Sequence, residues 1–444
     1  MEQVDLVIQA RWIVPVEPRG AVLDHHAIAI RSGRIVALLP AADAAARFTA
    51  TRTVERPQHV ILPGLVNAHT HAAMTLFRGM ADDMSLDRWL GEHIWPAEAR
   101  WASPDFVRDG TNLAIIEMLR GGTTCFQDMY LFPDVVAQTA VEHSIRAVVG
   151  MIAIDMPTAW AGDIDEYLSK GVAVHDQYKS HPLISTTFAP HSPHMITADT
   201  CERLRMLANE LDTPIHTHVH ETSDEIQTTM EKYGQRPLQR IDELGLVNPL
   251  LTAVHMTQLL DDEIALLAER GVSIVHCPES NLKLASGFCP TARLLDAGIN
   301  VALGTDGAAS NNDLDMLGEM RSAALLGKGV AGDATALSAV DVLAMATING
   351  ARALGLGDEI GSLVAGKQAD ITCIDLNEPA TQPVHHPVSQ LVYSASRDQV
   401  SDVWVAGEQL LEERRLVNND QTEILERAAA WQKRLAAFDP DDNE

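Results

Sequence analysis

Two histidines separated by one residue, His69 and His71, end the apolar segment PGLVNAHTH. The preceding residues are rich in Val, Leu and Ile, which is typical of a buried strand. Alternate side chains of a strand point to one face, so we expect both imidazoles to project together. Imidazoles about 7 Å apart along a strand can converge on one ion, because each zinc–nitrogen bond is roughly 2 Å long. Two ordinary hydrogen-bonded histidines are the alternative, and the remaining ligands decide between the two interpretations.

Further polar residues stand at the ends of later apolar segments and could complete a metal shell. His218 and Glu221 end the segment TPIHTHVHE. His255 ends LLTAVH, and Asp306 ends INVALGTD. Three imidazoles and one carboxylate suit a divalent cation and leave space for water. Each residue alone has an ordinary structural explanation, whereas their joint placement at strand ends favours a metal site.

The segment HTHVHE contains more histidines than one metal can use. His216, His218 and His220 alternate, and a regular strand would place all three on one face. A single ion cannot bind all of them in addition to the HxH pair and the aspartate. The residue pattern alone does not choose between His216 and His218.

The elements that must position these residues lie between positions 60 and 355, where short apolar runs alternate with helical patterns. The strand candidates are VILPGLVNAHTH, TTCFQDMY, RAVVGMIAI, LISTTFAPH, TPIHTHVHE, LLTAVHM, VSIVHCP and INVALGTD. Helix candidates between them include DGTNLAIIEMLRGG, TADTCERLRMLANELD and LDDEIALLAERG. Eight strand–helix units predict an α/β fold, a TIM-type (β/α)8 barrel with its site at the carboxyl ends of the strands. A doubly wound sheet is the competing topology. The barrel is favoured because polar residues end several different strands.

The segments before and after this region have a different residue pattern. Residues 1–58 and 358–444 alternate apolar and polar residues in short strand-like runs. We expect them to pair into a small β-sandwich beside a catalytic barrel at 59–357. The second segment also contains a terminal helix, ILERAAAWQKRLAAF, and an acidic tail, DPDDNE, that we expect to be solvated.

The composition excludes several classes of partner. The chain has 444 residues and a net charge of −28, from 61 acidic and 33 basic residues. This acidity argues against binding to nucleic acids or anionic membranes. Five scattered cysteines without a CxxC pair, and an N-terminus carrying Glu2 and Asp5, predict a cytoplasmic protein without a signal peptide. No apolar run approaches the roughly 18 residues of a membrane span. A homo-oligomer is compatible with the sequence.

The motifs PGLVNAHTH, HTHVHET and GTDG, with the strand-ending His255, resemble the amidohydrolase superfamily, and more narrowly its deaminase and chlorohydrolase branch. The resemblance covers nearly the whole chain. In that branch the metal-binding histidine begins an HxxE motif, which here selects His218 and Glu221. The ligands that the resemblance implies for one zinc or iron ion are His69, His71, His218 and Asp306. Binuclear members carry a lysine at the end of the fourth strand, whereas this strand ends in FAPH, so we expect one metal.

Such a shell implies hydrolysis, because metal-bound water ionises near neutral pH. Asp306 would accept the proton of the water, and His255 would orient and stabilise the developing charge. Glu221 would protonate a ring nitrogen of the substrate. Attack at a C–NH2 carbon is deamination and attack at C–Cl is dechlorination, so the shell does not settle the leaving group.

Two segments that carry the same resemblance narrow the range of expected substrates. LDRWLGEHIWPAEAR is similar to the part of methylthioadenosine/S-adenosylhomocysteine deaminases that presents a glutamate to the ribose hydroxyls. Glu98 matches that glutamate, with Trp89 as an apolar wall, and a carboxylate can accept from two vicinal hydroxyls. His191 in FAPHSPH matches the purine contact of the family. Glu221 and Asp306 complete the expected substrate contacts.

One departure from the family favours a small 5′ group on the nucleoside. Members that bind the amino-acid tail of S-adenosylhomocysteine use arginines between the third and fourth strands. Between Arg146 and Arg203 this chain has only Lys170 and Lys179. A lysine or a partner-subunit loop could substitute with weaker geometric specificity. We therefore favour 5′-methylthioadenosine or adenosine over S-adenosylhomocysteine as the substrate of an adenine nucleoside deaminase.

Two rival interpretations remain open. A deaminase or chlorohydrolase of a free base or triazine would have no ribose for Glu98 to engage. A barrel without catalytic activity is disfavoured by the complete set of candidate ligands and acids. In the loop PESNLKLASG, Asn281 and Lys283 either contact substrate or cap the loop.

Overall fold

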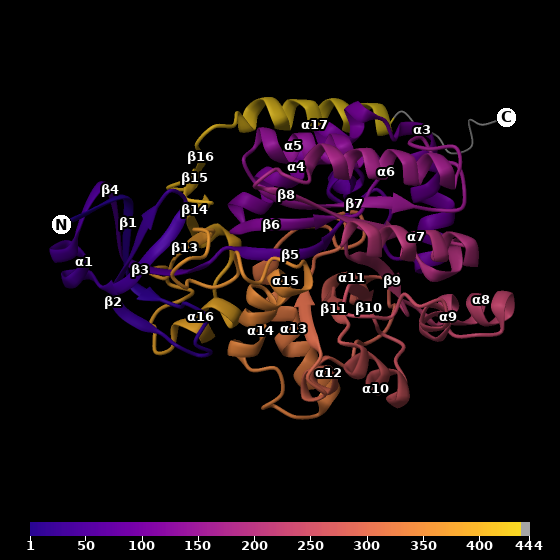
Figure 1. The fold of residues 1–444 in the computed structure, drawn as a ribbon. Coiled ribbons are helices and arrows are strands. Elements are labelled where there is room, and N and C mark those ends of the chain that lie inside the picture. Colours follow the sequence, from indigo (N-terminus) through magenta and orange to yellow (C-terminus); the bar gives the residue numbers. More distant parts are fainter. Residues whose placement is uncertain (437–444) are drawn as a thin grey trace.

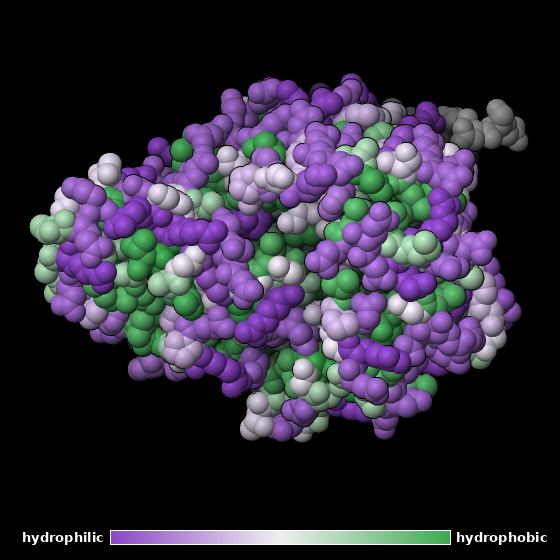
Figure 2. Space-filling view, in the orientation of Figure 1, coloured by the Kyte–Doolittle hydropathy of each residue, from purple (hydrophilic) through white to green (hydrophobic). Residues whose placement is uncertain are grey.

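The computed structural model describes residues 1–436, in which a barrel and a terminal sheet lie side by side (Figure 1). The acidic tail lies outside the described residues. Within residues 1–436, every helix is too short or too polar to cross a membrane. Figure 2 shows hydrophilic residues over most of the visible face, as the net charge leads one to expect.

All eight strand candidates of the central region become parallel strands of one sheet, in sequence order. The strands are β5 (Leu65–Thr70), β6 (Thr123–Asp128), β7 (Arg146–Ala153), β8 (Ile184–Pro190), β9 (Ile215–Val219), β10 (Leu251–His255), β11 (Ser273–His276) and β12 (Asn300–Leu303). A doubly wound sheet would reverse its strand order part-way, and this sheet does not. The predicted barrel is therefore confirmed.

Closure of the barrel brings the first and last strands together. The Asp306 N–H donates to the His69 carbonyl oxygen at 3.0 Å. The Asn67 side chain accepts from the Thr305 N–H at 3.0 Å and donates to the Thr305 hydroxyl at 2.8 Å. These contacts place the HxH motif directly beside the GTDG motif, although more than two hundred residues separate them in sequence.

The first apolar run does not form one strand. Its beginning belongs to β4 (Phe48–Pro63) of the terminal sheet, and β5 starts only at Leu65. Gly64 lies between them, and a Cβ built at this position would be 2.0 Å from the Thr124 hydroxyl oxygen. Only glycine, which has no Cβ, fits this close to Thr124. Gly64 is therefore the residue at which the chain passes from the terminal sheet to the barrel.

Helices and short helical turns surround the barrel strands and follow them in the chain (Figure 1). They are η1 (Ala72–Phe77), α2 (Leu86–Arg88), η2 (Trp89–Ile94), α3 (Trp95–Trp101), α4 (Pro104–Arg120), α5 (Pro133–Glu142), α6 (Ile164–Tyr178), η3 (Pro193–Met195), α7 (Ala198–Leu211), α8 (Ser223–Tyr233), α9 (Pro237–Glu243), α10 (Asp261–Arg270), α11 (Pro278–Lys283), α12 (Thr291–Asp296), α13 (Met316–Ala331), α14 (Ala339–Met345) and α15 (Ile348–Ala353). The three helix candidates correspond to α4, α7 and α10. Of these, α4 begins earlier than its apolar pattern, because Ser103 caps it by accepting from the Phe106 N–H at 3.3 Å.

The first and last segments of the chain share one eight-stranded mixed sheet, which confirms their predicted pairing. Besides β4 its strands are β1 (Glu2–Ile13), β2 (Leu23–Arg31), β3 (Arg34–Pro40), β13 (Ile371–Asp375), β14 (Val400–Val405), β15 (Glu408–Glu412) and β16 (Arg415–Leu416). The remaining helices near it are α1 (Ala41–Arg47), α16 (Pro387–Tyr393) and η4 (Arg397–Gln399). β13 pairs antiparallel with β4 and so joins the two ends of the chain. The terminal helix α17 (Gln421–Ala436) leaves this sheet and packs on α4, where the Trp431 indole donates to Asp109 at 2.9 Å.

Candidate active site

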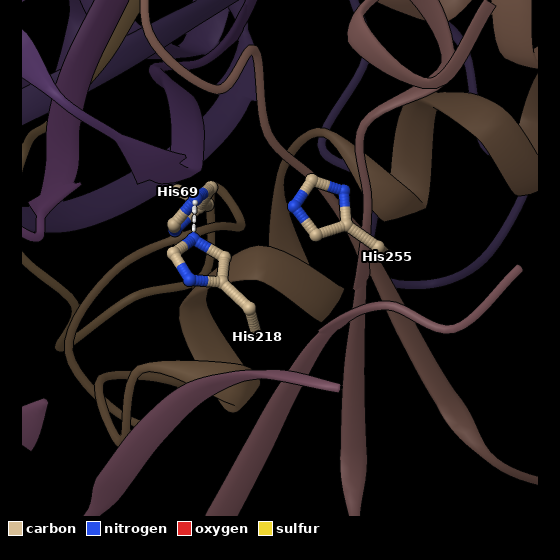
Figure 3. A group of neighbouring side chains, drawn as sticks. All are labelled: His69, His218 and His255. Atoms are coloured by element: carbon tan, nitrogen blue, oxygen red, sulfur yellow. Dashed lines mark hydrogen bonds between the residues drawn. The ribbon is translucent and has the colours of Figure 1, made fainter. Parts of the chain in front are cut away.

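Four candidate ligands converge at the carboxyl ends of the barrel strands. His69 Nε2 lies 3.1 Å from His218 Nε2 and 3.4 Å from Asp306 Oδ1. His71 Nε2 lies 3.2 Å from the same carboxylate oxygen. Figure 3 shows the His69 and His218 rings meeting through their nitrogens, with His255 directed toward the same space.

The donor set fits one divalent cation. Bonds of 2.0–2.1 Å in a tetrahedral zinc site place ligand atoms about 3.3 Å apart, close to the separations found here. His71 and His218 each have their Nδ1 at a backbone carbonyl, of Met129 at 2.5 Å and of His191 at 2.7 Å. A carbonyl only accepts, so each Nδ1 carries the proton and each Nε2 directs a lone pair into the cluster.

Asp306 is held on both of its oxygens. Oδ2 accepts from the hydroxyls of Ser280 at 2.7 Å and Ser310 at 3.0 Å, and Oδ1 accepts from the Gly307 N–H at 2.9 Å. Burial opposes ionisation, but the adjacent His69 and His71 hold the pKa of Asp306 well below its usual range, so its carboxyl group is ionised. Its backbone is left-handed, with φ +64°. Such strain is typical of functional positions.

His255 and Glu221, the expected acid–base residues, lie next to each other beside the candidate ligands. His255, also left-handed at φ +76°, ends β10 and presents Nε2 at 3.7 Å from a Glu221 carboxylate oxygen. Its Nδ1 lies 2.8 Å from Oδ1 of Asn281 on α11. Burial raises the pKa of Glu221, which favours a carboxyl group able to donate a proton.

The three histidines of HTHVHE take three different positions. His218 lies among the candidate metal ligands. His216 instead lies behind His69, with its Nε2 2.8 Å from His69 Nδ1. The expectation that His220 shares their face is wrong. β9 ends at Val219, and His220 adopts φ +55°, which turns its ring to accept from the Leu238 N–H at 3.1 Å.

A cavity of about 280 Å³ opens beside the cluster. All the expected substrate contacts line it, together with His71, His218 and His255, whereas His69 is fully buried beside them. The expected substrate contacts are Trp89, Glu98, His191, Glu221 and Asp306. Apolar lining comes mainly from η2 and from the ends of β6 and β7. Among the described residues that line the cavity there is neither lysine nor arginine.

Glu98 and Trp89 come from one short helical segment. Trp89 begins η2, is only 5% exposed, and forms part of the cavity wall. Glu98 follows on α3. Burial raises the pKa of Glu98 to about 7, although the neighbouring Tyr130 hydroxyl opposes the shift. Burial also lowers the pKa of His191 to about 3, so this ring is neutral at physiological pH.

The sequence interpretation missed several residues of the site and left others without a role. Tyr130 ends the strand candidate TTCFQDMY, and that position is the signal that could have identified it. Ser280 lies in the loop PESNLKLASG and reaches Asp306 from there. In the same loop, Asn281 supports His255, whereas Lys283 bonds Asp82 at 2.5 Å and does not line the cavity.

Comparison with known proteins gives one consistent result. Residues 60–410 match the amidohydrolase family. The chain is 50% identical over 434 residues to a 5-methylthioadenosine/S-adenosylhomocysteine deaminase of Teredinibacter turnerae, covering 98% of each chain. The crystal structure of an adenosine deaminase from Xanthomonas campestris with bound zinc superposes with a TM-score of 0.98 at 56% identity, covering 98% of this chain and 100% of that one.

A more distant structure shares the same fold. The zinc complex of the atrazine chlorohydrolase TrzN from Arthrobacter aurescens superposes with a TM-score of 0.90 at 26% identity, covering 96% of this chain and 99% of that chain. Family match, barrel topology and the converging His/Asp cluster agree with one another. The chain belongs to the amidohydrolase family.

Proposed function

We propose that the protein is a zinc-dependent hydrolytic deaminase that converts an adenine nucleoside, preferentially 5′-methylthioadenosine, to the corresponding inosine form and ammonia. The observation that carries this proposal is that Glu98 lines the same cavity as the candidate metal ligands His71, His218 and Asp306. A carboxylate that lines the cavity suits two vicinal ribose hydroxyls, and a free base has none. The names of the relatives at 50% and 56% identity support the same class of substrate.

The proposed reaction assigns roles to the candidate residues of the site. His69, His71, His218 and Asp306 would hold a divalent ion, which when bound would activate water as a Lewis acid. Asp306 accepts a proton from the attacking water, while Glu221 protonates a nitrogen of the purine ring and makes the adjacent carbon more electrophilic. His255 stabilises the charge that develops on the incoming oxygen. The C–N bond to the amino group then breaks: the amino group receives from Asp306 the proton that came from the water and leaves as ammonia, and the proton of the new C–OH group returns to Glu221 as the carbonyl forms.

The cavity favours an uncharged 5′ substituent. The two lysines between the third and fourth strands form exposed ion pairs, Lys170 with Glu166 and Lys179 with Asp176, each at 2.8 Å. Neither lines the cavity. The lining instead offers Ile152 and other apolar side chains, and it has neither lysine nor arginine to pair with the amino-acid carboxylate of S-adenosylhomocysteine.

Ammonia release from a panel of substrates, with metal analysis of the same sample, tests the proposal. The panel contains 5′-methylthioadenosine, adenosine, S-adenosylhomocysteine, free adenine, guanine and a chlorotriazine. We expect about one zinc per chain and the highest kcat/KM on methylthioadenosine. Equal activity on free adenine and on the nucleoside would move the protein to the free-base or triazine class. Two tightly bound metals per chain would contradict the mononuclear site.

The His218→Ala variant tests the ligand assignment separately from the substrate. Removing one of four ligands should lose most of the bound metal. Full metal occupancy in a folded His218→Ala variant would remove His218 from the ligand set.

A further inference from the structure

The site contains a buried histidine that the proposed reaction does not use. His216 lies on β9 two residues before His218, so both side chains point into the barrel. Its Nε2 is 2.8 Å from His69 Nδ1, while His218 Nε2 is 3.1 Å from His69 Nε2. Two histidines of the fifth barrel strand therefore contact both nitrogens of one ring from the first strand.

The other candidate ligands show what a partner at Nδ1 does. In His71 and His218 this nitrogen meets a backbone carbonyl, which leaves Nε2 free to bind an ion. In His69 the same place is taken by the Nε2 of His216. In a neutral imidazole one nitrogen carries the proton and only the other can accept a hydrogen bond. His216 Nε2 can therefore accept from His69, as the carbonyl oxygens do from His71 and His218, only if the His216 proton is on Nδ1.

We propose that His216 is a positioning residue of the metal site, which accepts a hydrogen bond from His69 Nδ1–H and so directs the His69 Nε2 lone pair toward the ion. This inference rests on the proposed metal enzyme, and His216 acts through His69 without touching substrate. The far nitrogen, His216 Nδ1, is buried with no hydrogen-bond partner among the described residues. An apolar side chain would avoid that unpaired donor, so the contact made by Nε2 accounts for an imidazole at this position.

Zinc affinity of the full-length protein, measured by competition with a chromophoric chelator, tests the proposal. His216→Leu keeps approximate volume but removes the acceptor, and we expect zinc binding to weaken by about 10- to 100-fold. His216→Gln offers a carbonyl oxygen in place of the ring nitrogen and should retain an affinity closer to that of the parent. Parent-like affinity in a folded His216→Leu variant, or an equal loss in both variants, would overturn the acceptor role.

His276→Leu is the matched control. His276 is a buried histidine at the end of β11, and among the described residues its ring makes no hydrogen bond to a candidate ligand. Zinc affinity should be unchanged in this variant. Circular dichroism of the metal-free proteins establishes which variants are folded.

A measurement on the unmodified zinc protein keeps the proposal testable if His216→Leu does not fold. Nitrogen-15 NMR of histidine side chains should find the proton of His69 on Nδ1 and that of His216 also on Nδ1. A proton on Nε2 of His216 would overturn the proposal. Zinc affinity and tautomer state do not depend on deamination, so a failed substrate assay would contradict the proposed function and leave this inference to be judged by its own results.

Discussion

Glu98 is the residue whose ionisation should control recognition of ribose. Its pKa is raised to about 7 by burial, so the carboxyl group is neutral below that pH and ionised above it. Only the ionised form accepts strongly from both the 2′ and 3′ hydroxyls. We therefore expect KM for adenosine to fall as pH rises through about 7. In Glu98→Gln, which does not titrate, this change in KM should be absent, and its persistence would assign the titration to another group.

Truncation of the same residue gives a second prediction about ribose. Each charge-assisted hydrogen bond is worth about 1.5–3 kcal/mol, so loss of the bonds to both hydroxyls in Glu98→Ala should lower kcat/KM on methylthioadenosine by roughly 10²-fold or more. The preference for ribosides over 2′-deoxyribosides should disappear with it. Metal content should be unchanged. A variant that still prefers ribosides would show that another group reads the 2′ hydroxyl.

A substitution of Glu221 can distinguish metal binding from proton transfer. It contributes no atom to the candidate ligand groups found among the described residues, and its carboxylate lies near His255. Glu221→Gln keeps the shape but cannot donate a proton in the same way. We expect full zinc content with turnover lowered by roughly 10²-fold or more. Measuring both on one sample decides the role, because an active variant would exclude Glu221 as the acid.

At the scale of elements, the strands and their polar ends could be predicted from the sequence, whereas local backbone geometry could not. Short apolar runs identified all eight barrel strands, and several of these runs end in or near a His or Asp. Nothing in the periodicity marks Gly64 as the division between β4 and β5, since the requirement comes from contact with Thr124 on another strand. The turn at His220 is likewise set by its left-handed backbone. The side-chain contacts of Asn281 depend on barrel closure, so they could not be predicted from the sequence either.

The short helix α11 provides an element-level prediction, because it supports two groups of the site at once. Ser280 bonds Asp306, and Asn281 Oδ1 faces Nδ1 of His255 at 2.8 Å. Asn281→Leu removes this acceptor and frees the His255 ring to shift, so kcat should fall by roughly 10- to 100-fold with zinc content retained. Leu282→Ala, an exposed position on the same helix, is the control and should leave kcat unchanged.

At the scale of the whole molecule, a buried ion pair connects the barrel to the terminal sheet. Arg146 at the start of β7 donates to both oxygens of Asp370, at 2.9 and 3.0 Å, and both side chains are at most 3% exposed. Asp370 precedes β13 and also accepts from the Ala406 N–H at 2.8 Å. The pair therefore ties the barrel to the start of β13 and to the end of its neighbouring strand β14, both far along the chain from β7.

Removing one partner of this pair should destabilise the protein strongly. Asp370→Ala leaves the Arg146 guanidinium buried without a counter-charge, and we expect the free energy of unfolding in urea to fall by about 3–5 kcal/mol. The control is Asp261→Ala, which breaks the exposed Arg293–Asp261 pair and should cost no more than about 1 kcal/mol. Because Asp370 lies in the terminal sheet rather than the active site, zinc content per folded chain should not change. An Asp370→Ala variant as stable as the control would show that this ion pair is not needed to hold the two parts of the molecule together.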